Sequence, residues 1–374
     1  MRKGIAREIV TELMQWLELC DECGACLEVC PTYKATQNDD FSPIGRIKAA
    51  RKIFQGEEVT PQIIESIYNC PECHLCSTVC PYNIDVPEIV TQSRVELVRR
   101  GLAPLERHNV IVEGIQRLGN SLNGDPSQRL VWLPEEFPSH ESSTLFFVGC
   151  LASYLVKDAA TSSYLLLKKL GVDFMILEDE GCCGIYYHEV GRLDLAREKF
   201  EENADRFKRL GIKRVIVVCA GCYHCFKRLY PQLLGSIDFE VVHIIQLLPS
   251  LLKEKGIKME QKGMEVTYHD PCRLGRLERF YDEPREALRL SGIKVNEIPE
   301  NRENALCCGA GAAVRSVYRD LSLKLATKIL DQAPVSPIVT PCPFCEFNFS
   351  YTARKTGSDK KVAYITDTIF KALS

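Results

Sequence analysis

The chain has 374 residues, and its hydrophobic fraction of 45% and charged fraction of 26% are those of a folded globular protein. These values exclude a disordered, collagen-like or coiled-coil chain, and the length predicts about two to three domains. Forty-seven basic and 50 acidic residues give a net charge of −3, so charge gives no reason to expect binding to nucleic acid or an anionic membrane. The unusual feature is the content of 19 cysteines, which in a reducing compartment favours metal ligation over disulfides.

The sequence contains no run of 18 apolar residues, so we expect no transmembrane segment. The N-terminal segment Ile5–Leu19 carries Glu8, Glu12 and Glu18, which predicts an amphipathic helix and not a signal peptide. We therefore expect a cytoplasmic protein, either free or attached peripherally to the cytoplasmic face of a membrane complex.

Two cysteine runs near the N-terminus share the spacing Cys-x2-Cys-x2-Cys-x3-Cys-Pro. They consist of Cys20, Cys23, Cys26, Cys30 and Pro31, and of Cys70, Cys73, Cys76, Cys80 and Pro81. This spacing is typical of bacterial ferredoxins with two [4Fe–4S] clusters, where the fourth cysteine of each run ligates the other cluster. We therefore assign one cubane to Cys20, Cys23, Cys26 and Cys80, and the other to Cys70, Cys73, Cys76 and Cys30. Two zinc sites are the alternative, but zinc ligands usually form cysteine pairs separated by a long gap.

The segments around these runs predict a helix-rich module that is larger than a minimal ferredoxin. Helices are expected over Ile44–Phe54, Pro61–Tyr68 and Glu88–Arg100. His74, inside the second run, is interpreted as a solvent-side residue or one that tunes the cluster. The stretch Asn120–His140 is rich in glycine and proline and predicts a linker.

The remaining cysteines form an internal repeat. The offsets are 122 residues from Cys150 to Cys272, 125 from Cys182 to Cys307 and 123 from Cys219 to Cys342. Each repeat also contains an adjacent Cys-Cys-Gly and a final Cys-x2-Cys. A nearly constant offset between separate elements is the signature of a duplication. Cys225 falls outside the pattern, because its counterpart is Asn348, and is interpreted as a buried or spare thiol.

Strands and helices alternate in both repeats, which predicts parallel sheets with right-handed crossovers. The predicted strands are Thr144–Val148, Asp173–Leu177, Arg214–Val218, Val241–Ile245, Glu265–Tyr268, Ile293–Ile298, Pro337–Thr340 and Val362–Ile365. The predicted long helices of the first repeat are Leu155–Leu170 and Leu193–Leu210. Cysteines follow the strands, at the sheet edge where parallel sheets bind ligands. Gly184 and Gly309 would let the backbone approach such a site closely.

The twin cysteine patterns behind a two-cluster ferredoxin module resemble the family of D-type subunits of heterodisulfide reductase. The segment Tyr268–Arg276 is similar to that family, although histidine is commoner at the position of Arg273, and so is Ala305–Gly311. The resemblance covers most of the chain. It implies an α+β fold with a helical ferredoxin-like module at 1–119, a linker at 120–142 and cysteine-rich domains at 143–260 and 261–374.

The resemblance also implies a non-cubane [4Fe–4S] cluster in each cysteine-rich domain. Its ligands would be Cys150, Cys182, Cys183, Cys219 and Cys222 in the first domain, and Cys272, Cys307, Cys308, Cys342 and Cys345 in the second. The two motifs differ slightly, with 35 residues between Cys183 and Cys219 but 33 between Cys308 and Cys342. Ordinary cubanes or zinc are the alternatives, because spacing alone does not report cluster type.

Several basic side chains flank these motifs. His188, His224 and His269 are interpreted as proton carriers or as hydrogen-bonding neighbours of the ligands. Arg273, Arg276 and Arg315 would bind an anionic substrate tail or offset the charge of the clusters. The sequence has no dinucleotide or P-loop motif, so a flavin or nicotinamide would belong to a partner.

The function implied by the resemblance is that of an enzyme subunit that reduces a disulfide, such as the coenzyme M–coenzyme B heterodisulfide, to two thiols. Its electrons would come from a donor subunit, either a flavoprotein or a membrane cytochrome b-type protein, for which Ile5–Leu19 offers a docking element. The alternative is a non-catalytic electron-transfer subunit between a flavin dehydrogenase and a quinone or other acceptor.

Overall fold

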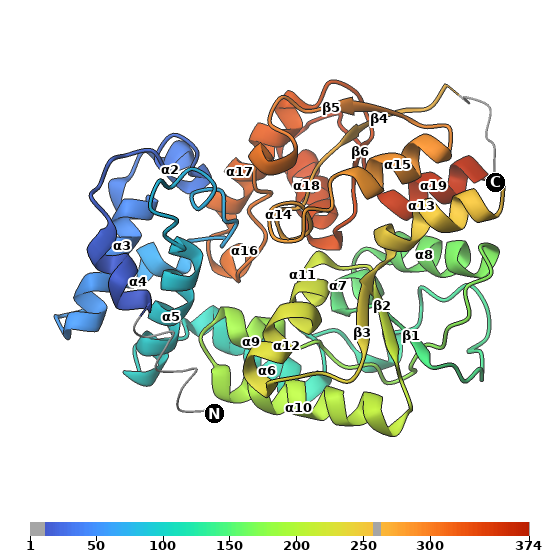
Figure 1. Cartoon of the computed structure of the whole chain (residues 1–374), viewed down its shortest axis with the longest axis horizontal. Helices are drawn as coiled ribbons and strands as arrows, with labels where there is room; N and C mark the ends of the chain where they lie inside the picture. The colour runs from blue at the N-terminus through green and yellow to red at the C-terminus, as the bar shows by residue number, and fades with distance from the viewer. Residues whose placement is uncertain (1–11, 257–262, 374) are drawn as a thin grey trace.

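The computed structural model describes residues 12–256 and 263–373, and its N-terminal part is the expected helical module (Figure 1). Residues 12–19 are helical, which accounts for the second half of the predicted N-terminal helix, whereas 5–11 lie outside the described residues. The other elements of the module are α2 (Pro31–Thr36), η1 (Asp39–Phe41), α3 (Pro43–Gln55), α4 (Pro61–Tyr68) and α5 (Val86–Arg99).

Side-chain caps begin the three longer helices of this module. Ser42 accepts a hydrogen bond from Gly45 at the start of α3, and Thr60 accepts one from Ile63 at the start of α4. In both helices the residue after the cap is proline, which suits the first helical position. The helices pack on one another around a separate small core, and so hold the two cysteine runs beside them.

The first repeat is built on a three-stranded parallel sheet in the order β1-β2-β3. The helix α6 (Glu106–Leu118) and the short turn η2 (Pro126–Gln128) precede it. Its elements are β1 (Thr144–Phe147), α7 (Cys150–Tyr154), α8 (Lys157–Lys169), α9 (Ile185–Glu189), α10 (Leu193–Arg209), β2 (Arg214–Val217), α11 (Ala220–His224), η3 (Cys225–Leu229), α12 (Tyr230–Leu234), β3 (Glu240–His243) and α13 (Ile244–Glu254).

The second repeat is built on a four-stranded parallel sheet in the order β5-β4-β6-β7. Its elements are β4 (Glu265–Tyr268), α14 (Cys272–Gly275), α15 (Asp282–Leu290), β5 (Lys294–Glu297), η4 (Arg302–Asn304), α16 (Val314–Val317), α17 (Arg319–Gln332), β6 (Ile338–Thr340), α18 (Pro343–Thr356), β7 (Val362–Tyr364) and α19 (Ile365–Leu373). The α+β class and the duplication are therefore as predicted.

The two sheets differ at one edge. The predicted strand Asp173–Leu177 is reduced to a single parallel bridge between Met175 and Leu145, whereas its counterpart β5 pairs along its length with β4. The predicted helix Leu155–Leu170 is observed as α8, and the separate short helix α7, which the sequence did not predict, precedes it.

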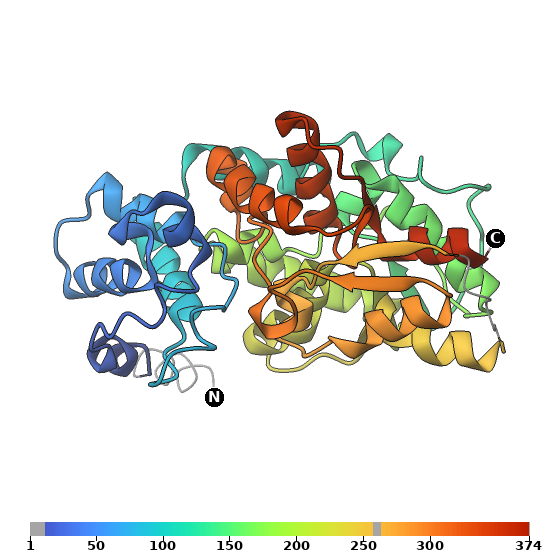
Figure 2. The same cartoon turned by 90° about the horizontal axis from the view of Figure 1, so that it is seen from above.

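The two repeats pack through corresponding helices. The last helix of the first repeat, α13, packs on α15, and the last helix of the second repeat, α19, packs on α8. Each contact thus joins the first long helix of one repeat to the final helix of the other, as in a dimer with a two-fold axis. Figure 2 shows the helical module at one end of the molecule and the paired repeats at the other.

The predicted linker 120–142 has little regular structure but is anchored on the first repeat. Trp132 is buried, with its ring edge-on to Phe146 and Tyr164. Arg129 forms a buried ion pair with Glu180, which also accepts hydrogen bonds from the backbone just before Cys150. Among the described residues, no helix is long and apolar enough to cross a membrane.

Candidate functional site

The cysteines of both repeats lie just beyond the carboxyl ends of the strands. Cys150 and Cys219 follow β1 and β2, and Cys272 and Cys342 follow β4 and β6. Cys219 and Cys342 are the N-cap residues of α11 and α18, so the thiols lie where the helix dipoles favour negative charge. A parallel sheet thus brings to one edge cysteines that are far apart in sequence.

These two edges face each other across a single cavity. It encloses about 830 Å³ of empty space, its open mouth included. All ten predicted ligands line it: Cys150, Cys182, Cys183, Cys219, Cys222, Cys272, Cys307, Cys308, Cys342 and Cys345. Nine of them are buried, and Cys272 is partly exposed. The two sites that the sequence suggested as separate therefore share one chamber.

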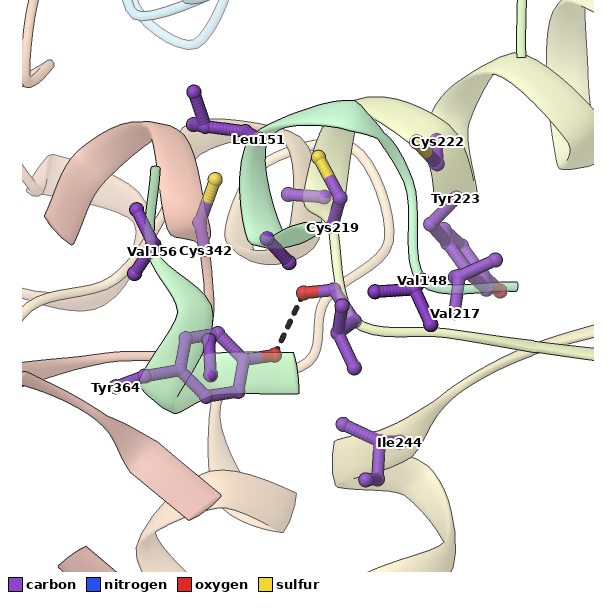
Figure 3. Packing of buried hydrophobic residues seen from close by; sticks show 14 of the residues in the cluster. Val148, Leu151, Val156, Val217, Cys219, Cys222, Tyr223, Ile244, Cys342 and Tyr364 are labelled. Carbon is purple, nitrogen blue, oxygen red and sulfur yellow. Dashed lines mark hydrogen bonds between the residues drawn. The ribbon is translucent and has the colours of Figure 1, made fainter. Parts of the chain in front are cut away.

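The thiols of Cys219 and Cys342, from different repeats, both line this cavity, and each affects the pKa of the other. Figure 3 shows both sulfur atoms pointing the same way above the packed strands. Beneath them the Tyr364 hydroxyl donates a 2.6 Å hydrogen bond to the Val218 carbonyl, which fastens the second repeat to the first (Figure 3). Within the second repeat the Sγ atoms of Cys345 and Cys308 are 3.2 Å apart.

The adjacent cysteine pairs are held in the same way in both repeats. The backbone N–H of Gly184 donates to the Cys182 sulfur over 3.4 Å, and that of Gly309 donates to the Cys307 sulfur over the same distance. Both glycines have positive φ, and a Cβ on either would meet neighbouring atoms at 3.0 Å. The two glycines therefore allow the close backbone turn that places both thiols in the cavity.

In each adjacent cysteine pair, the carbonyl group of the second cysteine accepts a hydrogen bond from a side chain that is not a predicted ligand. Cys225 Sγ donates to the Cys183 carbonyl over 3.3 Å, and Asn348 Nδ2 donates to the Cys308 carbonyl over 2.6 Å. The predicted spare thiol is completely buried and supports the ligand loop, as its counterpart does.

The eight cysteines of the helical module surround two further hollows. The first is lined by Cys20, Cys23, Cys26 and Cys80, and the second by Cys30, Cys70 and Cys73, with Cys76 at the edge of both. Cys23 is exposed, whereas Cys30, Cys70 and Cys73 are buried. The first hollow therefore lies at the surface, and the second lies in the interior.

Direct contacts link the second hollow to the large cavity. A hydrogen bond from Cys307 lowers the pKa of Cys73 to about 6. Arg276 donates to the Cys73 carbonyl over 2.6 Å and to the Ala305 carbonyl over the same distance, joining the two ligand loops. The buried Arg94 of α5 makes a second link, because it donates to backbone carbonyls in both repeats and forms a 2.7 Å ion pair with Glu72.

The flanking basic residues divide into different roles. Of the three arginines, only Arg273 lines the cavity, where it is paired with Glu189. Arg315 instead lies over the Tyr351 ring at 4.5 Å. The His269 ring is within hydrogen-bond distance of the Leu306 carbonyl, next to the second Cys-Cys pair.

The other two flanking histidines, His188 and His224, are buried or half-buried near Arg273. Burial, together with the nearby Arg273, lowers the pKa of His188 to about 4 and that of His224 well below its usual value. His74 is also mostly covered, lies 3.5 Å from an Asp85 carboxylate oxygen, and has its pKa lowered by burial. These imidazoles are therefore neutral around pH 7.

Sequence reasoning did not identify Glu189, Arg94 or Arg46 as part of the site. Their partners lie far away in sequence or are backbone groups, and no local motif marks such contacts. Arg46 is nearly completely buried and lies beside Cys30, with Nη1 3.8 Å from its sulfur.

The donor set fits iron–sulfur groups. Thiols are the ligands that iron–sulfur clusters use, and here they line hollows in sets of four and five. Among the described residues, no three His, Cys, Asp or Glu side chains are arranged to hold a single metal ion.

The chain matches known families along most of its length. Residues 16–84 match a 4Fe–4S dicluster domain, and residues 144–227 and 266–350 each match a cysteine-rich domain. The D-type subunit of the dihydromethanophenazine:CoB–CoM heterodisulfide reductase from Methanosarcina barkeri is 32% identical, over 97% of this chain and 95% of the relative.

More distant proteins show other contexts for the same architecture. The EtfAB:quinone oxidoreductase of Syntrophomonas wolfei is 29% identical over 96% of this chain, which spans 58% of that relative. A hypothetical protein from Helicobacter pylori, known from a crystal structure, has the same fold, with a TM-score of 0.62 at 10% identity. The match covers all of this chain and 77% of the Helicobacter pylori chain.

Proposed function

Because the chain belongs to the family of D-type heterodisulfide reductase subunits, we propose that this iron–sulfur oxidoreductase component reduces a disulfide to two thiols within a larger complex. The observation that carries the proposal is the single cavity lined by the cysteines of both repeats. A disulfide in this chamber would have one ligand set on each side, so each sulfur would face its own set as the bond breaks.

The balanced reaction adds two electrons and two protons to RSSR′ and releases RSH and R′SH. Bound [4Fe–4S] clusters would supply one-electron transfer, with two cubanes in the helical module and two non-cubane clusters in the cavity. The cubane ligands would be the sets assigned above, Cys20, Cys23, Cys26 and Cys80, and Cys70, Cys73, Cys76 and Cys30. Each five-cysteine set of a repeat would hold one further cluster.

The order of the sites supports one route for the electrons. Cys23 is exposed, so electrons would enter at the first hollow from a flavoprotein or a membrane cytochrome b-type partner. The second hollow is interior, and its Cys73 contacts Cys307 in the second repeat. The first repeat would receive electrons last, because its Cys219 lines the same cavity as Cys342 of the second repeat.

The test distinguishes electron delivery through the helical module from disulfide reduction in the cavity. Cys20→Ser should stop disulfide reduction driven by the protein donor but leave reduction driven by a small chemical reductant, whereas Cys183→Ser and Cys308→Ser should abolish both. The assay is thiol release under anaerobic conditions, starting with the heterodisulfide of coenzymes M and B that the relatives' names suggest. Fully loaded protein should contain about 16 irons per chain. Equal losses with the chemical reductant for all three variants would contradict the division of roles.

The second candidate function is electron relay without chemistry on a disulfide. Its support is the similarity to the EtfAB:quinone oxidoreductase. In that case a flavoprotein would reduce the loaded chain, a quinone would reoxidise it, and no disulfide would change the spectrum of the oxidised protein. Thiol release that depends on Cys308 would decide for the enzyme.

A further inference from the structure

The adjacent cysteines of the first repeat are held from behind, through both of their carbonyl groups. The Tyr230 hydroxyl donates to the Cys183 carbonyl over 3.0 Å, and Cys225 Sγ donates to the same carbonyl over 3.3 Å. Asn203 Nδ2 donates to the Cys182 carbonyl over 3.0 Å and to the Tyr230 oxygen over 2.9 Å. All three donors are buried, and none of the three lines the cavity. They therefore form a supporting group on the far side of the ligand loop.

A π-helical turn lets two side chains of one helical segment reach the same carbonyl group. This turn is η3, and the backbone N–H of Tyr230 donates to the Cys225 carbonyl, five residues earlier. In an α-helix, residues five apart point about 140° away from each other, whereas the longer turn brings them to the same side. Pro231 follows and has no N–H to donate back into the helix, which favours such a break. The irregular turn thus directs Cys225 and Tyr230 together at the cysteine pair.

Aromatic packing fixes the orientation of Tyr230. Its ring stacks on Phe200 with centroids 4.1 Å apart and meets Phe226 edge-on at 4.8 Å. A Cβ added at Gly184 would lie 3.0 Å from the same Phe200 ring, so this ring also bounds the turn that follows the cysteine pair. The hydroxyl of Tyr230 is therefore held at the Cys183 carbonyl by the rigid packing of its ring.

The second repeat supports its cysteine pair less extensively. Asn348 Nδ2 donates to the Cys308 carbonyl over 2.6 Å and to the Ser322 carbonyl over 3.4 Å. No other side chain in the described part of the chain donates to a carbonyl group of Cys307 or Cys308. The helix α18 runs through the corresponding positions without a π-helical turn. Cys272, in the same ligand set, is partly exposed, whereas the first repeat has all five of its thiols buried.

We propose that Tyr230, Asn203 and Cys225 are positioning residues for the iron–sulfur cluster of the first repeat, and that this repeat retains its cluster more firmly than the second. Loss of a cluster requires its ligand loop to open, and the three donors hold this loop at both carbonyl groups. Side chains that orient metal ligands in this way commonly change metal retention by tenfold or more. The inference rests on the cluster assignment within the proposed function but not on the identity of the disulfide.

Loss of each cluster to an iron chelator provides the test. The loaded, oxidised protein is incubated anaerobically with the chelator, and the electron paramagnetic resonance signals are followed over time. Cys183→Ser and Cys308→Ser each remove a ligand from one repeat, so the signal that is absent in each variant identifies the repeat to which it belongs. In the unaltered protein we expect the signal of the second repeat to decay before that of the first.

Tyr230→Phe keeps the stacked ring and removes only the hydroxyl. We expect the signal of the first repeat to shift and to decay about tenfold faster, with the signal of the second repeat unchanged. Asn203→Leu, which frees the Cys182 carbonyl, should act on the same signal. The matched control is Tyr164→Phe, which removes the hydroxyl of another buried tyrosine of this repeat that is bonded to Glu135, and it should change neither signal.

Cys225→Ser tests whether the thiol positions the loop or binds iron. Serine keeps a donor for the Cys183 carbonyl, so we expect the cluster of the first repeat to be retained as in the unaltered protein. Loss of the signal to the extent seen in Cys183→Ser would show that Cys225 is a ligand and would overturn its assignment as a positioning residue.

The outcomes separate this inference from the proposed function. Faster decay of the first repeat's signal in the unaltered protein, or no selective effect of Tyr230→Phe, would overturn the inference while disulfide reduction stands. The expected decay rates without thiol release from any disulfide would support the inference and refute the proposed reaction. About eight irons per chain in the unaltered protein, with signals of the two cubanes alone, would overturn both.

Discussion

Arg46 should raise the reduction potential of the cluster proposed for Cys70, Cys73, Cys76 and Cys30. It is 2% exposed, and its hydrogen bonds go to neutral groups on Thr32, Asn69 and Ser66, with Nη1 3.8 Å from Cys30 Sγ. Burial acts to lower the pKa of Arg46, but the thiolates of Cys70 and Cys30 outweigh it and raise the pKa overall. The thiolates are therefore the counter-charge of this buried cation.

The size of the effect follows from this geometry. At an effective dielectric constant of about 20, two unit charges about 4 Å apart interact by about 4 kcal/mol. This is the upper limit for the interaction of Arg46 with an electron located at the nearest ligand. An added electron spreads over the whole cluster, and a mean distance of about 7.5 Å gives about 2 kcal/mol. For a one-electron step this corresponds to about 90 mV. Arg46→Gln should thus lower one midpoint potential by about 90 mV.

Redox titration monitored by electron paramagnetic resonance, on anaerobically prepared protein, measures the shift. Arg46→Lys keeps the positive charge, so its midpoint potential should stay within about 30 mV of that of the unaltered protein. The same is expected for Lys48→Gln, which removes a 53% exposed charge on the same helix. Full iron content with unchanged potentials in Arg46→Gln would refute the electrostatic argument.

Three other substitutions test how the parts are joined, each read from anaerobic unfolding curves. Arg94→Met leaves Glu72 buried and unpaired and should lower the free energy of unfolding by about 3–5 kcal/mol. Arg99 is 72% exposed on the same helix, so Arg99→Met should change it by less than about 0.5 kcal/mol. Equal effects of the two substitutions would contradict the role of Arg94. Burial lowers the pKa of His108 to about 3, so the unfolded chain binds the extra proton first. His108 should then contribute about 1 kcal/mol to the loss of stability between pH 7 and pH 5.5. The loss over this range should be smaller by that amount in His108→Phe, and an equal loss would exclude this cause. Tyr364→Phe removes the hydrogen bond between the repeats and should cost about 1 kcal/mol, and no loss would mean that the bond adds nothing.

The sequence predicted most of the elements and the grouping of the cysteines, because ligand spacing and strand–helix alternation are local signals. The strand at Asp173–Leu177 was overestimated, since only Met175 finds a partner along it. The single shared cavity could not be predicted, because it depends on how α13 packs on α15 and α8 on α19. The pairing of Arg273 with Glu189 is of the same kind, as the two residues lie in different repeats.

In the contacts of α13 with α15 and of α19 with α8, each repeat packs its last helix on the other repeat. This arrangement has a consequence for how the sequences of the two repeats can come to differ. A single repeat alone would expose the apolar faces of its first and last helices and only half of the chamber, and would complete both by pairing with a copy of itself. Such a homodimer would have two equivalent halves and would need two helical modules. Joining the halves in one chain removes that equivalence, so that one module contacts the second repeat through Cys73 and Cys307. The two repeats then need not stay identical in sequence, and Cys225 and Asn348 are different residues that donate to the equivalent carbonyl group in each repeat.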